Sequence, residues 1–199
     1  MKLYGNNASP FARKARIIAH ELGLKLEEVR TLPATDENFR RVNPLGKIPA
    51  LLLDDGTVIA ESIAICRYFE ALHPDPPLFG RGALESALVE MWNRRAELHL
   101  LFPVAAVFQH LHPAMKQMVQ PQVPDWGEAN KPRVSAFLQF LDGELKERPF
   151  VAGANYTVAD ITALVAVDFM RVSKLVVPDE LGNVRRWHQT VSGRPSAAA

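Results

Sequence analysis

A segment dense in proline and glycine divides this chain of 199 residues into two parts with different patterns. The segment is HPDPPLFGRG, residues 73–82, and this composition favours turns over helices and strands. Short strand-like runs alternate with helical runs before it, whereas only helical periodicity recurs after it. The sequence therefore predicts an α/β domain over residues 1–76, a linker over 77–82 and an all-α domain over 83–199.

The first domain is expected to contain a small sheet with helices packed on it. Strand signals cover residues 2–5, 25–32, 48–53 and 57–60, and helical signals cover residues 10–22, 36–41 and 62–72. The last two strands flank Asp54-Asp55-Gly56, which is a strong hairpin-turn signal. A hairpin at the end of a strand–helix alternation predicts a mixed sheet rather than a purely parallel one.

The second domain is expected to be helical throughout. Helices are predicted over residues 83–112 with an interruption at Pro103, and over 132–147, 158–172 and 183–191. Residues 157–160 read Thr-Val-Ala-Asp, which has the form of a capping box with Asp in place of the usual Glu. We therefore interpret Asp160 as a structural residue.

Composition narrows the classes of partner and compartment. Lys plus Arg number 23 and Asp plus Glu number 22, so the chain has no basic field suited to nucleic acid. The single cysteine, Cys66, cannot form an intrachain disulfide, which fits a reducing compartment. The sequence shows neither a signal peptide nor an apolar run that suits a membrane helix. The six histidines show no metal-ligand spacing, so we expect a cytoplasmic protein without a metal site.

Ile48-Pro49 opens an apolar strand signal. Proline cannot donate to a sheet ladder, so it belongs at a sheet edge or at a distortion. If the bond is cis, the bend would present the Ile48 backbone to an extended peptide, which could add as a short strand. The alternative is an edge-strand proline without any role in binding.

Two candidate residues mark helix starts. Ser9 precedes the helix expected from Pro10, and Ser62 follows Glu61 at the start of the next. Either serine can be a simple N-cap. A helix N-terminus also offers unpaired N–H groups to a carboxylate, and Glu61 could pair with an amino group beside it. Glu61-Ser62 would then suit a ligand with an α-amino acid moiety.

Four motifs in this order resemble the glutathione transferase superfamily, in particular its bacterial, cytosolic, serine-type members. They are SPFARKAR (9–16), NPLGKIPALLLDDG (43–56), AESIAICRYFE (60–70) and YTVADI (156–161). The resemblance spans nearly the whole chain. It implies a thioredoxin-like N-terminal domain, an all-helical C-terminal domain and a homodimer.

The resemblance also implies roles for the residues that bind glutathione. Pro49 would be a cis-proline, and the Ile48 backbone would pair with the cysteinyl part of the tripeptide. Glu61 and Ser62 would hold the γ-glutamyl group. Lys47 would reach the glycyl carboxylate, although this contact varies across the family.

The catalytic assignment rests on fewer residues. Ser9 falls where serine-type members place the hydroxyl that contacts the glutathione sulfur, and Asn7 is the alternative donor. We expect the electrophile in a cleft between the two halves, with Phe102, Phe108 and Met115 as candidates for its pocket. A role in the core or in a dimer contact is the alternative for each of the three.

The implied function is a glutathione transferase involved in detoxification. It would ionise the glutathione thiol and direct it at a small, apolar electrophile, with glutathione as co-substrate and no further cofactor. Two alternatives stay open. One is a glutathione-dependent peroxidase or disulfide reductase, although no cysteine lies near Ser9. The other is a non-catalytic glutathione-binding protein of the same fold.

Overall fold

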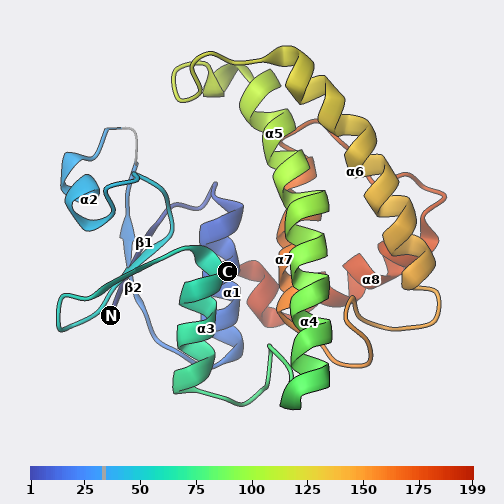
Figure 1. Ribbon diagram of the computed structural model, residues 1–199, viewed down its shortest axis with the longest axis horizontal. Helices are drawn as coiled ribbons and strands as arrows, with labels where there is room; N and C mark the ends of the chain where they lie inside the picture. The colour runs from blue at the N-terminus through green and yellow to red at the C-terminus, as the bar shows by residue number, and fades with distance from the viewer. Residues whose placement is uncertain (33–34) are drawn as a thin grey trace. The chain divides into compact units, whose positions relative to one another are not determined.

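The computed structural model describes residues 1–32 and 35–199, and the chain divides into two compact units (Figure 1). Unit 1 contains Met1–Leu78 together with Pro195–Ala199, and unit 2 contains Phe79–Arg194. The first combines strands and helices and the second is helical. The predicted fold class, an α/β domain followed by an all-helical domain, is confirmed.

Unit 1 is a four-stranded mixed sheet with three helices. Its elements are β1 (Lys2–Gly5), α1 (Pro10–Glu21), β2 (Glu27–Arg30), α2 (Glu37–Val42), β3 (Ala50–Leu52), β4 (Val58–Ala60) and α3 (Ser62–Leu72). The strand order is β2-β1-β3-β4, with β1 parallel to β2 and antiparallel to β3. Strands β3 and β4 form the predicted hairpin.

The helices of unit 1 cover both faces of this sheet. Helices α1 and α3 lie side by side on one face, and α2 lies on the other (Figure 1). Phe39 of α2 is buried and its ring centroid lies 5.7 Å from that of Tyr4 on β1. The α1–α3 side is filled by buried aliphatic residues such as Ile17 and Ile65. The buried residues of the sheet lie on its central strands, β1 and β3.

The last residues of the chain belong to unit 1, although the sequence assigns them to the second domain. The Arg13 guanidinium of α1 donates to the Ala197 carbonyl over 2.7 Å, and the Ser196 hydroxyl donates to the Glu21 carboxylate. Both Ser196 and Ala197 are buried. The C-terminal turn therefore completes the packing of α1.

Unit 2 is a bundle of helices. Its elements are α4 (Gly82–Ala96), the π-helical turn η1 (Glu97–Leu101), α5 (Phe102–Leu111), the 3-10 turn η2 (Pro113–Met115), α6 (Pro124–Glu144), α7 (Val158–Met170) and α8 (Gly182–Ser192). Almost every residue of α7 is buried, which makes it the central helix. Measured against the length and hydropathy of a membrane-crossing helix, every helix in the described part of the chain falls short.

Pro103 explains the break between α4 and α5. Proline has no N–H to donate to the carbonyl four residues earlier, here that of His99. The backbone widens into the π-helical turn η1, in which the Phe102 N–H donates to the Glu97 carbonyl. The two helices and the turn form one nearly continuous rod in Figure 1.

The sequence misplaced the start of α6. The helix begins at Pro124, and Pro132, which was predicted to open it, lies in its interior. Pro132 and Glu128, four residues earlier, are both exposed. Pro132 has no N–H to donate to the Glu128 carbonyl, and water can donate to this exposed carbonyl instead. The helix therefore tolerates this proline.

Candidate functional site

The register of the sheet brings three segments of unit 1 to one edge. Ala50 of β3 pairs with Ala60 of β4 on one side and with Tyr4 of β1 on the other. The residues next along these strands are Pro49, before β3, and Glu61, after β4. The start of β3 and the ends of β1 and β4 therefore lie together, and we call this edge the candidate site.

The Ile48-Pro49 bond is cis, as the resemblance implies. Two other bonds to proline, Asp75-Pro76 and Gln120-Pro121, are also cis. Strand β3 begins only at Ala50, and Ile48 makes no backbone–backbone hydrogen bond among the described residues. The amide and carbonyl of Ile48 thus remain for an extended peptide.

Lys47 is exposed at the end of the loop that precedes this proline. The Asn43 side chain donates to the Lys47 carbonyl over 2.7 Å, which fixes the loop backbone. The structure shows no hydrogen bond or ion pair of the Lys47 ammonium within the described residues. Its charge is therefore not neutralised by a carboxylate of the described chain.

Glu61 has an unusual backbone conformation, with φ 68° and ψ 121°. A positive φ is uncommon for residues other than glycine, and it costs about 1–3 kcal/mol in sparsely populated regions. The turn at Glu61 redirects the chain from β4 into α3. Nothing in the residue type signals this turn, so it could not be predicted from the sequence.

Ser62 is not the N-cap that the sequence predicted. The cap position belongs to Glu61, whose side chain makes no capping hydrogen bond, and Ser62 is the first helical residue. Ser62 is 5% exposed. The first N–H groups of α3 therefore lack a side-chain cap, which leaves them able to bind a ligand carboxylate.

Ser9 caps helix α1. Its Oγ accepts a hydrogen bond from the Ala12 N–H over 3.2 Å. This bond uses the oxygen as acceptor, so the hydroxyl proton can still be donated to another group. The half-buried Ser9 is thus an N-cap that still has a donor for another group.

Asn7 lies in the exposed turn between β1 and Ser9. The turn is held by its neighbour Asn6, whose side chain accepts from the Ala8 N–H over 3.1 Å and donates to the Thr31 carbonyl over 3.4 Å. Ser9 and Asn7 both stay predictions for the group that contacts a thiol.

The three candidates for an electrophile pocket all belong to unit 2. Phe102 begins α5 and is 44% exposed. Phe108 packs edge-on against Phe169, with ring centroids 5.2 Å apart. Met115 is half-buried in η2. Their role in substrate binding stays a prediction.

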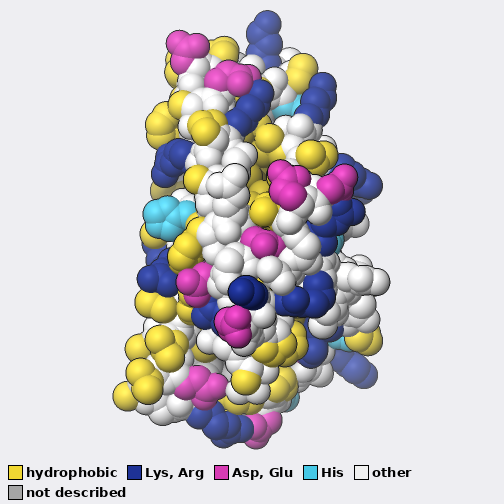
Figure 2. All heavy atoms as spheres, turned by 90° about the vertical axis from the view of Figure 1, so that its right-hand side faces the viewer, with side chains coloured by type: hydrophobic (Ala, Val, Ile, Leu, Met, Phe, Trp, Pro, Cys, Tyr) yellow, Lys and Arg dark blue, Asp and Glu magenta, His cyan; other side chains and the backbone are white. Residues whose placement is uncertain are grey.

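Metal ligands, the cysteine and the surface charges were also located in the described part of the chain. No group of three or more His, Cys, Asp or Glu residues there could hold a metal ion. Cys66 is buried in α3. Acidic and basic side chains are interspersed on the face shown in Figure 2, in keeping with the formal net charge of +1.

Comparison with known proteins places this arrangement in a family. Residues 3–77 match the family model for the N-terminal domain of glutathione S-transferase, and residues 101–195 match that for its C-terminal domain. Glutathione S-transferase 2 of Saccharomyces cerevisiae is 36% identical, with 98% of this chain and 87% of that protein covered. The crystal structure of Gtt2 from Saccharomyces cerevisiae matches with a TM-score of 0.94 at 35% identity, covering 100% of this chain and 99% of that one.

The relatives also include proteins that are not named as transferases. Elongation factor 1-gamma 2 of Oryza sativa subsp. japonica is 30% identical over 98% of this chain, which spans 46% of that protein. The fold, both family models and the yeast relative all indicate the same family. The chain belongs to the glutathione S-transferase superfamily.

Proposed function

We propose that the chain is a glutathione transferase that binds glutathione at the candidate site and directs its thiolate at a small, apolar electrophile. The observation that carries this proposal is the sheet register, which brings Pro49, Glu61 and the loop to Ser9 to one edge. Each of these segments supplies a different group for the same tripeptide.

The recognition of glutathione follows from the chemistry of these groups. The Ile48 amide and carbonyl pair with the cysteinyl residue, as in strand addition. The γ-glutamyl end carries an amino group and a carboxylate on one carbon. The Glu61 carboxylate binds this amino group. The uncapped N–H groups of α3 and the Ser62 hydroxyl bind the carboxylate. Lys47 pairs with the glycyl carboxylate.

The activation of the thiol requires more than one group. A free thiol has a pKa of about 8.5, and lowering it by two units takes about 2.7 kcal/mol of preferential stabilisation of the thiolate. A helix N-terminus contributes up to about 2 kcal/mol when partly buried. A hydrogen bond to a charged group contributes about 1.5–3 kcal/mol. The Ser9 hydroxyl and the N-terminus of α1 therefore suffice together.

The first prediction tests this step. In Ser9→Ala, the pKa of the bound glutathione thiol should rise by about one unit, because a hydrogen bond to the thiolate is lost. The measurement is a titration of the thiolate absorbance in the ultraviolet. Ser9→Thr keeps a hydroxyl at this position and serves as the matched control.

Ser9→Ala also loses a helix cap, which lowers the free energy of unfolding by about 1 kcal/mol. Unfolding in urea therefore accompanies the titration and shows that the variant is folded at the temperature used. An unchanged pKa in folded Ser9→Ala would remove Ser9 from the mechanism. Asn7→Ala would then be expected to raise it instead.

Two alternatives remain testable with the same protein. A peroxidase or disulfide reductase that works through a protein mixed disulfide is disfavoured, because the single cysteine is buried in α3. A non-catalytic role is the second alternative, and one relative is named as an elongation factor and not as a transferase. Turnover of glutathione with aryl halides, epoxides, peroxides and disulfides separates the three. Retention on immobilised glutathione without turnover of any substrate favours the non-catalytic protein.

A further inference from the structure

The short turn between β1 and α1 carries both candidates for the thiol contact, Asn7 and Ser9. At its start, Gly5 lies so close to α1 that an added Cβ would be 2.9 Å from the Cβ of Ala12. At its end, Ser9 is the N-cap of α1, and its N–H donates to the Asn6 carbonyl over 3.3 Å. The position of the Ser9 hydroxyl therefore depends on the conformation of the turn that begins at Asn6.

Asn6 stabilises this turn through both ends of its side-chain amide. The Oδ1 atom accepts from the Ala8 N–H over 3.1 Å, which is the pattern of an Asx turn. The Nδ2 group donates to the Thr31 carbonyl over 3.4 Å, which connects the turn to the end of β2. An alanine at this position could make neither bond.

Thr31, the second partner of Asn6, is itself held in place. It is 2% exposed, and its N–H donates to the Gly5 carbonyl over 3.0 Å. Its hydroxyl donates to the carboxylate of Asp36, the N-cap of α2, over 2.7 Å. The Asn6 amide is therefore bonded to a fixed part of the sheet.

The backbone carbonyl of Asn6 has a further partner on α1. The Arg16 guanidinium donates to it over 3.5 Å, and Arg16 is 8% exposed. The Glu28 carboxylate of β2 lies 4.0 Å from the same guanidinium. Asn6 thus contacts α1 through its carbonyl and the end of β2 through its side chain, so it fixes the turn between them.

We propose that Asn6 is a positioning residue for the reaction, which holds Ser9 where its hydroxyl can donate to the thiolate of bound glutathione. This inference rests on the proposed function. A hydrogen bond weakens as its length and angle depart from the optimum, and reacting groups must be held to within about 0.5 Å. The Asn6 amide is engaged by Ala8 and Thr31, so Asn6 acts through Ser9 and does not contact the sulfur itself.

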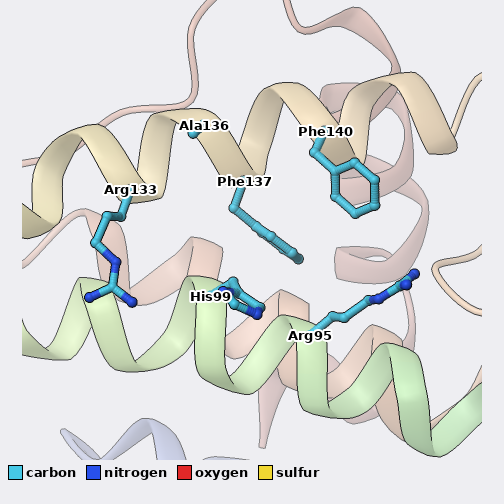
Figure 3. Close-up of a pocket in the computed structure, with 6 residues that line it drawn as sticks. All are labelled: Arg95, His99, Arg133, Ala136, Phe137 and Phe140. Carbon is cyan, nitrogen blue, oxygen red and sulfur yellow. The ribbon is translucent and has the colours of Figure 1, made fainter.

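The test requires glutathione and no electrophile. Unit 2 has a groove of about 420 Å³ between α4–η1 and α6, shown in Figure 3, which is lined by Arg95, His99, Arg133, Ala136, Phe137 and Phe140. The residues predicted for the electrophile pocket, Phe102, Phe108 and Met115, are not among them. The thiolate forms without an electrophile, so its absorbance reports on Asn6 whatever the second substrate is.

Titration of the thiolate absorbance in Asn6→Ala tests the proposal. The pKa of the bound thiol should rise by about half a unit, less than in Ser9→Ala, because the bond from Ser9 is misaligned and not lost. Asn6→Ser keeps a hydroxyl that can accept from the Ala8 N–H more weakly, so its rise should be smaller. Retention on immobilised glutathione should stay unchanged in both variants, since Pro49 and Glu61 are intact.

A double-mutant cycle separates positioning from a direct effect on the sulfur. Adding Asn6→Ala to Ser9→Ala should cause no further rise of the pKa, because the group that Asn6 positions is then absent. Asp55→Ala is the matched control. Asp55 accepts from the Thr57 N–H over 2.8 Å in the same kind of turn, at the exposed tip of the β3–β4 hairpin. Its loss should leave the pKa of the bound thiol unchanged.

Two results would overturn this inference and leave the proposed function intact. One is an unchanged thiol pKa in folded Asn6→Ala, and the other is a rise of equal size with and without Ser9. Unfolding in urea shows which variants are folded, and Asn6→Ser carries the test if Asn6→Ala is not. A wild type that neither retains glutathione nor lowers the pKa of its thiol would instead refute the proposed function, and the inference with it.

Discussion

At the scale of single residues, Glu61 combines an unusual backbone conformation with a proposed role in binding glutathione. Its positive φ is maintained although a glycine would adopt it more readily. The same conformation directs the chain into α3 with an uncapped N-terminus and an exposed carboxylate beside it. Backbone strain is often found at ligand sites, and its release should be measurable.

We predict that Glu61→Gly raises the free energy of unfolding by about 1 kcal/mol and weakens retention on immobilised glutathione. Glu61→Gln keeps the strain and should lower retention alone. Lys174, the other non-glycine residue with positive φ among the described residues, offers a control in unit 2. Lys174→Gly should stabilise the protein without changing retention. A less stable Glu61→Gly would show that the conformation is not strained.

Residue types predicted most of the candidate site, yet not its backbone. The sequence pointed to Pro49, Glu61 and Ser9 because proline and helix-start residues have strong local preferences. It assigned the cap of α3 to Ser62, and the structure assigns it to Glu61. A left-handed turn at a glutamate is imposed by tertiary packing, so no local pattern could have revealed it.

At the scale of helices and strands, Asp160 links three segments of unit 2. Its carboxylate accepts from the N–H groups of Val151 and Thr157, from the Thr157 hydroxyl and from the Trp187 indole of α8, over 2.8–3.3 Å. The predicted capping box of α7 is confirmed. Burial raises the pKa of Asp160 to about 6, although these four donors act in the opposite direction.

We predict that Asp160→Asn destabilises the protein, because its amide group must face N–H donors and leave at least one unpaired. Each buried donor left unpaired costs about 1–3 kcal/mol. Since the folded pKa exceeds that of the unfolded chain, the contribution of Asp160 is largest below about pH 4 and declines as the pH rises through about 6.

The difference in unfolding free energy between wild type and Asp160→Asn should therefore be larger at pH 5 than at pH 7.5. Urea unfolding of both proteins at the two pH values measures it, and the titration of other groups cancels in the difference. A difference that grows with pH would mean that the four donors outweigh burial.

Helix boundaries were predictable where caps and glycines mark them. Helix α1 follows Ser9 and ends before Gly23, whose φ is 65°. The predicted interruption at Pro103 is also confirmed, by the π-helical turn that precedes it. The prediction at Pro132 was wrong, because this exposed proline lies inside α6 and does not open it.

At the scale of the whole molecule, α4 carries an exposed apolar stripe. Leu84, Leu88 and Met91 are 74%, 40% and 36% exposed, at spacings of four and three. Such a row matches the a and d positions of a helix that packs on a partner. It supports the homodimer that the family resemblance implies, with a contact on the amino-terminal part of α4.

We predict that the protein is a dimer at micromolar concentration and that Leu88→Glu makes it monomeric, because the change places charge in an apolar contact. Analytical ultracentrifugation measures both states. Gln139→Glu, an exposed position on α6, adds the same charge elsewhere and should remain dimeric. A monomeric wild type would refute the contact.

The arrangement of the chain into units was only partly predictable. The change in pattern at residues 73–82 located the passage from strands to helices. The membership of Pro195–Ala199 in unit 1 depends on the bond from Arg13 to Ala197, which joins residues far apart in the sequence. Periodicity describes neighbours along the chain and cannot predict such a contact.

The return of the C-terminus to α1 has a consequence for protein engineering. Cutting the chain at the linker would give an N-terminal fragment without the turn that covers part of α1, the helix that Ser9 caps. A tag fused after Ala199 would likewise emerge beside that helix. The first unit is discontinuous in the sequence, so an isolated version needs residues 195–199 rejoined to residues 1–78 by a designed loop.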